Sequence, residues 1–150
     1  MNAELPILQV EDDDNDVIFL QHAFSEAAIT NPLQLARNGQ EAIDYISGNG
    51  KYANRQEYPI PGLVLLDLKL PRVSGLEVLQ WLRRSSTLRG LPVIVFSSSA
   101  RRQDIEEAYA SGANSFLVKP SSLDKRIELA RLIKAYWLEF NEPATGIEKV

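Results

Sequence analysis

Three separated segments of this chain carry acidic residues or a lysine directly after a short apolar run. They are Val10-Glu11-Asp12-Asp13, Leu65-Leu66-Asp67-Leu68-Lys69-Leu70-Pro71 and Phe116-Leu117-Val118-Lys119-Pro120. Short apolar runs of this kind are typical of buried strands in a parallel sheet, so each segment marks the carboxyl end of a strand. Ligands bind at those ends in open parallel sheets. Carboxylates gathered around one lysine repel one another and lose hydration, which proteins tolerate where a divalent cation and a phosphoryl group fill the gap.

Asp67 is the strongest candidate nucleophile, because it ends an apolar run in which a lone carboxylate would be costly to bury. A carboxylate can attack a phosphoryl group and form an acyl phosphate, a step that needs in-line positioning and neutralisation of charge. Asp12 and Asp67 could both ligate Mg²⁺, while Glu11 holds a water. Lys119 would pair with the phosphate from the opposite side, and the Ser97 hydroxyl would donate to another phosphoryl oxygen. Asp67 alone could be a helix cap, but the three segments together favour the chemical role.

The elements that position these residues alternate five times between strand and helix. The expected strands are Leu5–Glu11, Leu33–Arg37, Gly62–Asp67, Pro92–Ser97 and Ser115–Val118. The expected helices are Asp14–Ala28, Gly39–Ser47, Ser74–Arg84, Arg101–Ala110 and a last one from Ser121 or Ser122 to about Phe140, with Asp13 or Asp14 capping the first. This alternation predicts an α/β fold with a flavodoxin-like (βα)5 doubly wound parallel sheet of strand order 2-1-3-4-5. In that order the ends of strands one and three are neighbours, so Glu11, Asp12 and Asp67 share one crevice.

Composition excludes several other classes of protein. The 150 residues, 45% of them hydrophobic, fit one domain, and the absence of cysteine excludes disulfides, a thiolate nucleophile and a cysteine zinc site. No apolar run is long enough for a bilayer, and the first residues lack the pattern of a secretion signal, so we expect a cytoplasmic protein without a membrane contact. The net charge of −4 gives no reason to expect DNA binding. The arginines between Arg83 and Arg89 are interpreted as a solvated helix end.

Two stretches fall outside the alternation. Residues 48–61 form a long polar connection that we expect either to extend the second helix or to make a surface flap. Residues 141–150 form a tail, expected to be poorly ordered, that follows a domain of residues 1–140.

Glu11-Asp12, Asp67-Leu68-Lys69-Leu70-Pro71 with Gly75, Ser97, and Lys119-Pro120 together resemble the conserved set of two-component response regulator receiver domains. Phe116, three residues before Lys119, fits the same pattern. The resemblance covers about Leu5 to Phe140. The stretches Asn38-Gly39-Gln40-Glu41-Ala42, Leu70-Pro71-Arg72-Val73-Ser74-Gly75 and Gly112-Ala113-Asn114-Ser115-Phe116 are most similar to stand-alone receivers that serve bacterial, especially cyanobacterial, phytochrome histidine kinases.

The resemblance implies a role for each matching residue. Asp67 is the phosphoacceptor, and Mg²⁺ or Mn²⁺ is bound by Asp12, by Asp67, by the backbone carbonyl of Lys69 and, through water, by Glu11. Ser97 is the switch hydroxyl, Phe116 the switch aromatic and Lys119 the phosphate-binding cation. The Lys119–Pro120 bond is expected to be cis. The implied function is to accept a phosphoryl group from a histidine kinase, with a phytochrome-type kinase as the expected partner, and to change a protein-contact surface.

The alternatives belong to two other classes. An aspartate-nucleophile phosphatase of the haloacid-dehalogenase type would resemble Asp-x-Asp at the acceptor strand, but Lys69 takes the place of its second aspartate. We therefore expect no enzyme beyond a domain that catalyses its own phosphorylation and dephosphorylation. A phosphate-independent binding module of the same fold would not need the complete set of acidic residues, Ser97 and Lys119.

The last helix carries more apolar surface than one sheet needs. One face holds Leu123, Ile127, Ala130, Ile133 and Trp137, and the adjoining one holds Leu129, Leu132, Tyr136 and Phe140. Either the helix lies deep under the C-terminal tail, or the surplus contacts another subunit. We expect a homodimer through Ile133, Tyr136, Trp137 and Phe140.

Overall fold

A five-stranded parallel sheet forms the centre of the fold in this computed structural model, which describes residues 4–144. The strands are β1 (Ile7–Val10), β2 (Leu33–Ala36), β3 (Leu63–Leu66), β4 (Val93–Ser97) and β5 (Ser115–Val118). Their order is β2-β1-β3-β4-β5, so the flavodoxin-like topology predicted from the sequence is confirmed. Every residue of β1, β3 and β4 is buried, as expected for central strands covered on both faces.

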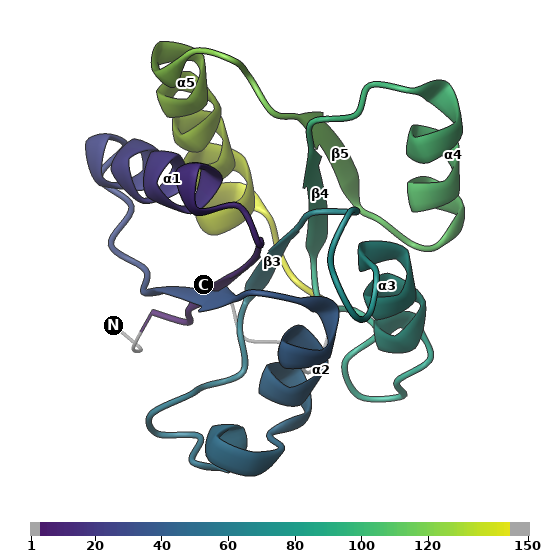
Figure 1. Cartoon of the computed structure of the whole chain (residues 1–150). Helices are drawn as coiled ribbons and strands as arrows, with labels where there is room; N and C mark the ends of the chain where they lie inside the picture. The colour runs from purple at the N-terminus through teal and green to yellow at the C-terminus, as the bar shows by residue number, and fades with distance from the viewer. Residues whose placement is uncertain (1–3, 145–150) are drawn as a thin grey trace.

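Helices cover the two faces of the sheet unequally (Figure 1). Those on one side are α1 (Asp14–Glu26) and α5 (Leu123–Ile133), and those on the other are α2 (Gly39–Ser47), α3 (Gly75–Arg83) and α4 (Arg102–Ala110). Each side has its own apolar core, one centred on α1 and α5 and one on α2 and α3. Within residues 4–144, no helix combines the length and apolar character that crossing a bilayer requires.

Side-chain caps fix where the helices at the functional edge begin. The Asp13 carboxylate accepts hydrogen bonds from the backbone N–H groups of Asn15 and Asp16 and so starts α1. The Ser122 hydroxyl accepts from the backbone N–H of Lys125 and starts α5. The sequence left two neighbouring candidates at each position, and the structure selects Asp13 and Ser122. Each cap satisfies backbone donors that the first helical turn leaves unpaired.

The end of the last helix is a π-helix, η2 (Lys134–Phe140), and this changes which side chains face the core. A 3.6-residue period pairs Ile133 with Trp137, whereas a π turn pairs residues five apart. Ile133 and Leu138 are accordingly buried at 4% and 7% exposure. The prediction that Ile133 contributes to a dimer surface is therefore wrong. Trp137 is half-buried against the same core, while Tyr136 and Phe140 are 59% and 79% exposed.

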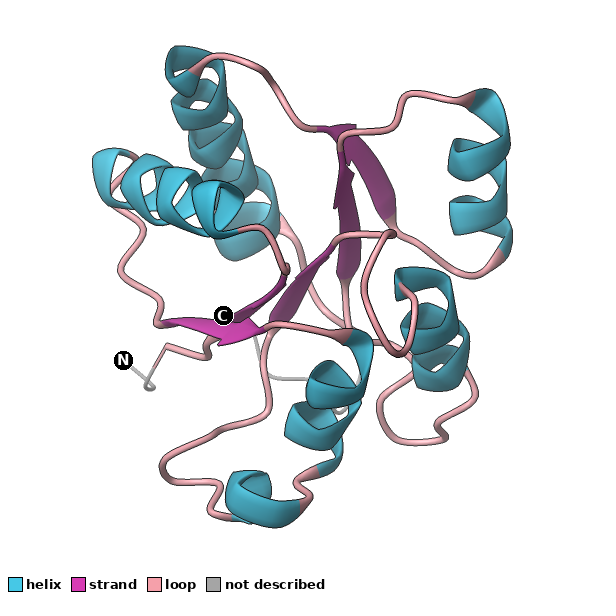
Figure 2. Cartoon of the chain, viewed as in Figure 1, coloured by secondary structure: helices cyan, strands magenta, loops and turns pink. Residues whose placement is uncertain are grey.

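The connection of residues 48–61 packs onto the domain instead of extending α2 (Figure 2). Gly48 ends α2 with φ of 77°, a left-handed conformation that suits glycine, and the 3-10 helix η1 (Gly50–Ala53) follows. The rings of Tyr52 and Tyr58 contact Tyr45 at centroid distances of 5.0 and 5.9 Å. Arg55 donates to the carbonyls of Tyr45 and Ile46 at 2.8 and 2.6 Å. The segment thus caps the C-terminal end of α2.

Arg83 is a half-buried structural residue, so its interpretation as part of a solvated helix end is wrong. Its guanidinium donates to the carbonyls of Gly112, Arg89 and Leu91 at 2.8 to 2.9 Å and to the Asn114 side chain at 2.8 Å. These acceptors lie in the loops before β4 and β5. The pattern of charges along the chain could not reveal them, because they meet only in the folded protein.

Candidate functional site

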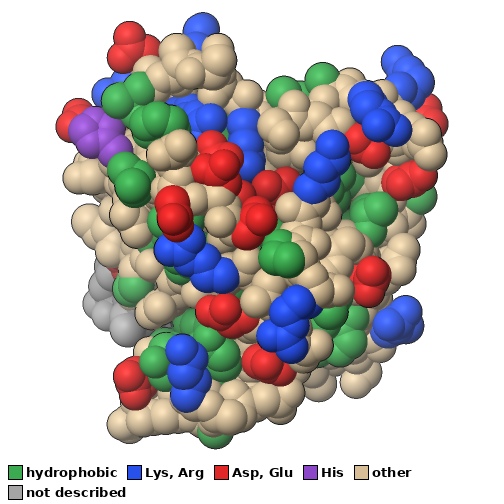
Figure 3. Space-filling model, in the orientation of Figure 1, with side chains coloured by type: hydrophobic (Ala, Val, Ile, Leu, Met, Phe, Trp, Pro, Cys, Tyr) green, Lys and Arg blue, Asp and Glu red, His purple; other side chains and the backbone are tan. Residues whose placement is uncertain are grey.

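The strand register places the predicted site residues at one edge of the sheet. Val10 of β1 lies opposite Leu66 of β3, so Glu11 and Asp67 leave adjacent strands at the same level. The backbone N–H of Asp67 donates to the Val10 carbonyl at 3.1 Å, and the N–H of Lys119 donates to the Ser97 carbonyl at 2.7 Å. The ladder therefore continues one residue beyond the strands and holds the functional residues rigidly. Figure 3 shows acidic side chains gathered near the centre of the molecular face in this view.

Lys119 is the centre of the site, and its ammonium contacts three carboxylates. The Nζ atom lies 2.6 Å from Glu11 Oε1, 2.8 Å from Asp16 Oδ2 and 3.0 Å from Asp67 Oδ2. The Lys119 side chain is 5% exposed, so these contacts are shielded from water. Burial alone would lower the pKa of Lys119, but the hydrogen bonds to Asp16 and Glu11 and the charge of Asp67 raise it above its ordinary value. The lysine stays a cation and can hold an anionic group beside Asp67.

Glu11 is the most buried acid of the site, at 2% exposure. Burial raises the pKa of Glu11 above its ordinary value, and the charge of Asp67 adds to this, although the hydrogen bond from Lys119 opposes it. The charged form of such a buried carboxylate is stabilised by any further positive charge that binds close to it.

The carboxylates offer a donor set that fits a hard divalent cation. One oxygen each from Glu11, Asp12 and Asp67 lie within 4.8 Å of one another, and Asp12 is exposed while the other two are buried. Mg²⁺ and Mn²⁺ prefer oxygen ligands, and Mg²⁺ keeps several waters, which the exposed side at Asp12 admits. Lys69 follows Asp67 by two residues, and its N–H lies 3.5 Å from Asp67 Oδ1. These residues fit the metal that the sequence predicts.

Two glycines allow the loop after β3 to approach the helices closely. A Cβ on Gly75 would lie 2.1 Å from the Asp67 carbonyl oxygen, and one on Gly39 would lie 1.9 Å from the Val73 carbonyl oxygen. Both distances are far shorter than any tolerated contact with backbone. Gly75 therefore lets α3 begin directly against the backbone of Asp67, which fixes the position of that residue.

The end of β4 holds Ser97 and an ordered loop. Ser97 is 1% exposed, and its Oγ accepts a hydrogen bond from the Ser99 N–H at 3.1 Å. The Ser99 hydroxyl in turn donates to Asp104 of α4 at 2.5 Å. Phe116 of β5 is half-buried and packs against a small cluster of Leu68, Val95 and Ala108. The two predicted switch residues thus lie on the neighbouring strands β4 and β5, which are connected in the chain through α4.

Sequence reasoning missed two residues of the site, Asp16 and Arg126. Asp16 contacts Lys119 through one oxygen and Arg126 Nη1, at 2.8 Å, through the other. Arg126 is 8% exposed, and its guanidinium also lies 5.2 Å from the Phe19 ring centroid. Burial would raise the pKa of Asp16, but the hydrogen bonds from Lys119 and Arg126 together lower it. No local spacing signals either residue, because their contacts join α1 to the start of α5 and to Lys119 after β5.

The bond between Lys119 and Pro120 is trans, since no peptide bond among residues 4–144 is cis. The expectation of a cis bond is wrong for this structure, which has the isomer that X–Pro bonds intrinsically favour. His22 is exposed on α1, and its Nε2 lies 4.0 Å from Glu26 Oε1.

Comparison with known proteins agrees with this geometry. Residues 7–131 match the response regulator receiver domain family. The probable methanogenesis regulatory protein FilR2 of Methanothrix harundinacea is 37% identical over 146 residues, covering 94% of this chain and 90% of that protein. Response regulator Rcp1 of Synechocystis is 32% identical over 138 residues, covering 92% of each chain.

Two solved structures share nearly the whole fold. The Mn²⁺-bound form of response regulator Rcp1 gives a TM-score of 0.82 at 30% identity, covering 94% of this chain and 99% of that chain. The phosphorylated cyanobacterial phytochrome response regulator RcpA gives a TM-score of 0.87 at 31% identity, covering 95% of this chain and 100% of that chain.

This chain therefore belongs to the response regulator receiver domain family. It is related to phytochrome response regulators, and the resemblance drawn from the sequence is confirmed. Receiver domains are signalling domains that work with histidine kinases and bind Mg²⁺ or Mn²⁺ at an acidic site.

Proposed function

We propose that this protein accepts a phosphoryl group from a histidine kinase onto Asp67 in a Mg²⁺-dependent reaction and changes its protein-contact surface in response. The observation that carries the proposal is the contact of one buried lysine with Asp67 and Glu11, beside the three-carboxylate donor set. The class of reaction follows from a nucleophilic carboxylate, a metal site and a fixed cation meeting at one point.

An oxygen of Asp67 would attack phosphorus while the bond from phosphorus to the donor nitrogen breaks and its electron pair stays on nitrogen, giving an acyl phosphate. Asp12, Asp67, the Lys69 carbonyl and, through water, Glu11 would hold Mg²⁺ or Mn²⁺, which neutralises charge on the transferring group when bound. Lys119 donates to a phosphoryl oxygen from the other side. Its acidic neighbours raise its pKa, which keeps it charged.

The switch would begin at Ser97. Its hydroxyl would turn from the Ser99 N–H, 3.1 Å away, to donate to the phosphoryl group. This movement frees space on the adjacent strand, where the half-buried Phe116 can turn further inward. A phosphoryl group that contacts only one of the two arrangements shifts the population toward it.

The test is the intact mass after incubation with acetyl phosphate and Mg²⁺. We expect an adduct of about 80 Da on the wild type, as a phosphoryl group requires, and none on Asp67→Asn, whose amide is a poor nucleophile. Asp14→Asn is the matched control, because Asp14 is an exposed acid on α1 paired with Arg37. Labelling of Asp67→Asn, with peptide mapping to another residue, would refute the assignment of the acceptor. Turnover of free phosphate esters would instead favour a phosphatase, and a lack of any adduct a phosphate-independent module.

We infer that the kinase partner is a bacterial phytochrome. The likeness to the cyanobacterial phytochrome response regulator RcpA and to the bacteriophytochrome response regulator RtBRR supports this over nearly the whole chain. The measurement is the rate of phosphotransfer from purified autophosphorylated kinases. A phytochrome kinase should transfer at least about tenfold faster than an unrelated histidine kinase, and equal rates would remove the inference.

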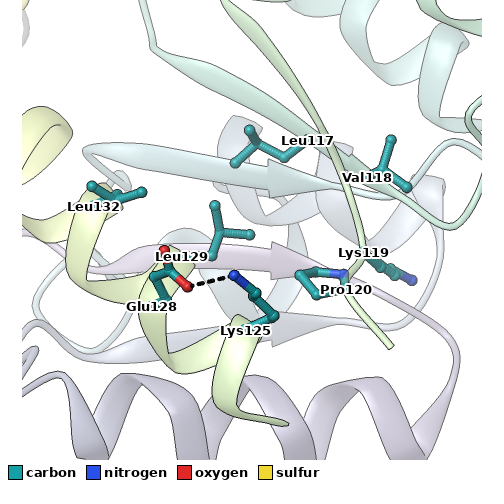
Figure 4. Close-up of a pocket in the computed structure, with 8 residues that line it drawn as sticks. All are labelled: Leu117, Val118, Lys119, Pro120, Lys125, Glu128, Leu129 and Leu132. Carbon is teal, nitrogen blue, oxygen red and sulfur yellow. Dashed lines mark hydrogen bonds and ion pairs between the residues drawn. The ribbon is translucent and has the colours of Figure 1, made fainter. Parts of the chain in front are cut away.

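The contact surface is proposed to form a homodimer through α5 and η2. Leu132, Tyr136 and Phe140 are 60%, 59% and 79% exposed on successive turns. Beside them, β5 and α5 border a groove of about 400 Å³ (Figure 4). Its apolar lining is Leu117, Val118, Pro120, Leu129 and Leu132, with Lys125 and Glu128 paired at 3.1 Å on the rim. An isologous dimer would cover this apolar surface on both copies at once.

Sedimentation at high micromolar concentration, with and without beryllofluoride, tests the dimer. Phe140→Glu should weaken association by about 2 kcal/mol or more, as truncating an aromatic anchor often does, and leave the mass adduct unchanged. Trp137→Ala should weaken it too, but Trp137 also packs on the core, so Phe140→Glu is the cleaner variant. A wild type that stays monomeric in both conditions would refute the dimer and leave the phosphoacceptor assignment intact.

A further inference from the structure

The Asp16 carboxylate lies between two buried cations that belong to different elements. Its Oδ2 accepts from Lys119 Nζ, and its Oδ1 accepts from Arg126 Nη1, each at 2.8 Å. The Lys119 and Arg126 side chains are 5% and 9% exposed, and Asp16 is 18% exposed. Asp16 belongs to α1, Lys119 follows β5, and Arg126 lies near the start of α5.

Every N–H donor of the Lys119 ammonium is used in this arrangement. An ammonium group has three N–H donors, and three carboxylates accept from it at 2.6, 2.8 and 3.0 Å. Two of the three, Glu11 and Asp67, belong to the reaction site itself. Asp16 is the third, and it sits outside the metal donor set, so it can hold the ammonium throughout a reaction that changes the other two.

Arg126 contacts both partners of this third contact, the Asp16 carboxylate and the backbone next to Lys119. Its Nε donates to the carbonyl of Pro120 at 2.8 Å, and its Nη1 binds Asp16. Because Pro120 follows Lys119 directly, one guanidinium restrains both the backbone next to the lysine and the carboxylate that holds its ammonium. The cation–π contact of Arg126 with the Phe19 ring, 5.2 Å from the ring centroid, restrains the guanidinium in turn.

We propose that Asp16 is a positioning residue that holds the Lys119 ammonium beside Asp67, and that Arg126 keeps Asp16 in place. The part of this proposal that concerns phosphate rests on the proposed function, because it takes Lys119 as the phosphate-binding cation. The competing explanation is that Asp16 and Arg126 only tie α1 to α5 and that the contact with Lys119 is incidental.

The first measurement uses the phosphate-free protein and does not depend on the proposed function. Lysine side-chain NMR reports the rate at which the Lys119 ammonium exchanges hydrogen with water. Asp16→Asn offers one acceptor oxygen and one NH2 group to two cations, so one cation must face a donor. We expect exchange at least about tenfold faster than in the wild type, as the loss of a charge-assisted hydrogen bond implies. Asp14→Asn, on the same helix turn but paired with Arg37, should leave the rate unchanged.

The second measurement is beryllofluoride binding with Mg²⁺ in Asp16→Asn, Arg126→Gln and the double variant, with thermal unfolding recorded for each. We expect Asp16→Asn to weaken binding at least about tenfold and Arg126→Gln by a smaller factor, and the double variant to resemble Asp16→Asn. If Asp16 served only to neutralise Arg126, removing both would restore binding and exchange to wild-type values, and the proposal would fail.

The outcomes separate the two levels of inference. An exchange rate in Asp16→Asn within about twofold of the wild type, or an equal acceleration in Asp14→Asn, overturns the positioning role, since a lost charge-assisted hydrogen bond should have a larger effect. A wild type that binds no beryllofluoride overturns the phosphoacceptor function, and the exchange rate then decides on Asp16 alone.

Discussion

The buried Lys119 and the half-buried Arg83 each join different parts of this domain, but Lys119 has charged partners and Arg83 has neutral ones. Lys119 contacts three carboxylates, those of Glu11, Asp16 and Asp67. Arg83 donates to neutral groups, namely three backbone carbonyls and one side-chain amide oxygen. Both side chains use all or most of their donors within folded structure. The difference lies in what happens when a new anion arrives.

Neutral partners give Arg83 a fixed role. If Arg83 moved away, the loop carbonyls would lose their hydrogen-bond donor. Arg83 therefore keeps the loops before β4 and β5 joined. Carboxylates around Lys119 repel one another, and that repulsion is relieved when a metal or another ligand changes the charge of the cluster. A buried cation with a surplus of acidic partners therefore marks a place for chemistry, and one with carbonyl partners marks a structural joint. The same distinction applies to Arg55, which caps α2 through carbonyls.

The largest effect on stability is predicted for Arg83→Met. This change keeps the aliphatic stem but leaves the carbonyls of Gly112 and Leu91 without a donor, and we expect the free energy of unfolding to fall by about 3 kcal/mol. The acetyl phosphate adduct should persist wherever the variant is folded. Chemical denaturation measures the first and intact mass the second. Arg84→Met, at the neighbouring exposed arginine, is the control and should change stability by less than about 0.5 kcal/mol.

The contrast between these regions also explains what the sequence could predict. Glu11, Asp12, Asp67, Ser97 and Lys119 were predicted because each ends or follows an apolar strand, and the parallel topology makes those ends neighbours. No comparable rule covers Asp16 or Arg126, whose directions depend on how α1 packs against α5.

Two other misses have a similar origin. Arg83 was interpreted from its neighbours in sequence, but its acceptors come from the loops before two different strands. Ile133 was counted among the surplus apolar residues of the last helix, but it packs into the core with Leu138, because the 3.6-residue period does not continue through the π-helix that begins at Lys134. Local patterns therefore predicted the elements and the strand-end chemistry, and failed where a side chain's surroundings are decided by a distant segment or by a change of helix type.

Lys119→Ala should have the next largest effect on the free energy of unfolding, and the size of this effect should depend on whether Mg²⁺ is bound. Without Mg²⁺, Glu11 and Asp67 lose the charged donor that they share, and we expect a loss of about 2 kcal/mol in unfolding free energy, as for a lost hydrogen bond to a charged group. Saturating Mg²⁺ should restore more stability to this variant than to the wild type, because it supplies the missing positive charge. The protein should still form some adduct but fail to pass the change to its contact surface. Lys125→Ala, an exposed lysine, is the control. Equal stability of Lys119→Ala and wild type in EDTA would contradict the comparison.

The smallest effect, with the opposite sign, is predicted for Asp12→Asn. Asp12 is exposed and contributes negative charge to a cluster that already has Glu11 and Asp67, so removing its charge relieves repulsion. In metal-free buffer the unfolding free energy should rise by about 0.5 to 1 kcal/mol, consistent with the weakness of exposed charge interactions. Phosphorylation at equal Mg²⁺ should nevertheless fall severely, because Mg²⁺ loses a carboxylate ligand. Asp13→Asn is a useful contrast, since asparagine can still cap α1 and both properties should stay close to wild type. A variant at Asp12 that is labelled at the normal rate would remove this residue from the metal site, while a loss of stability in metal-free buffer would show that the acidic cluster is not under mutual repulsion.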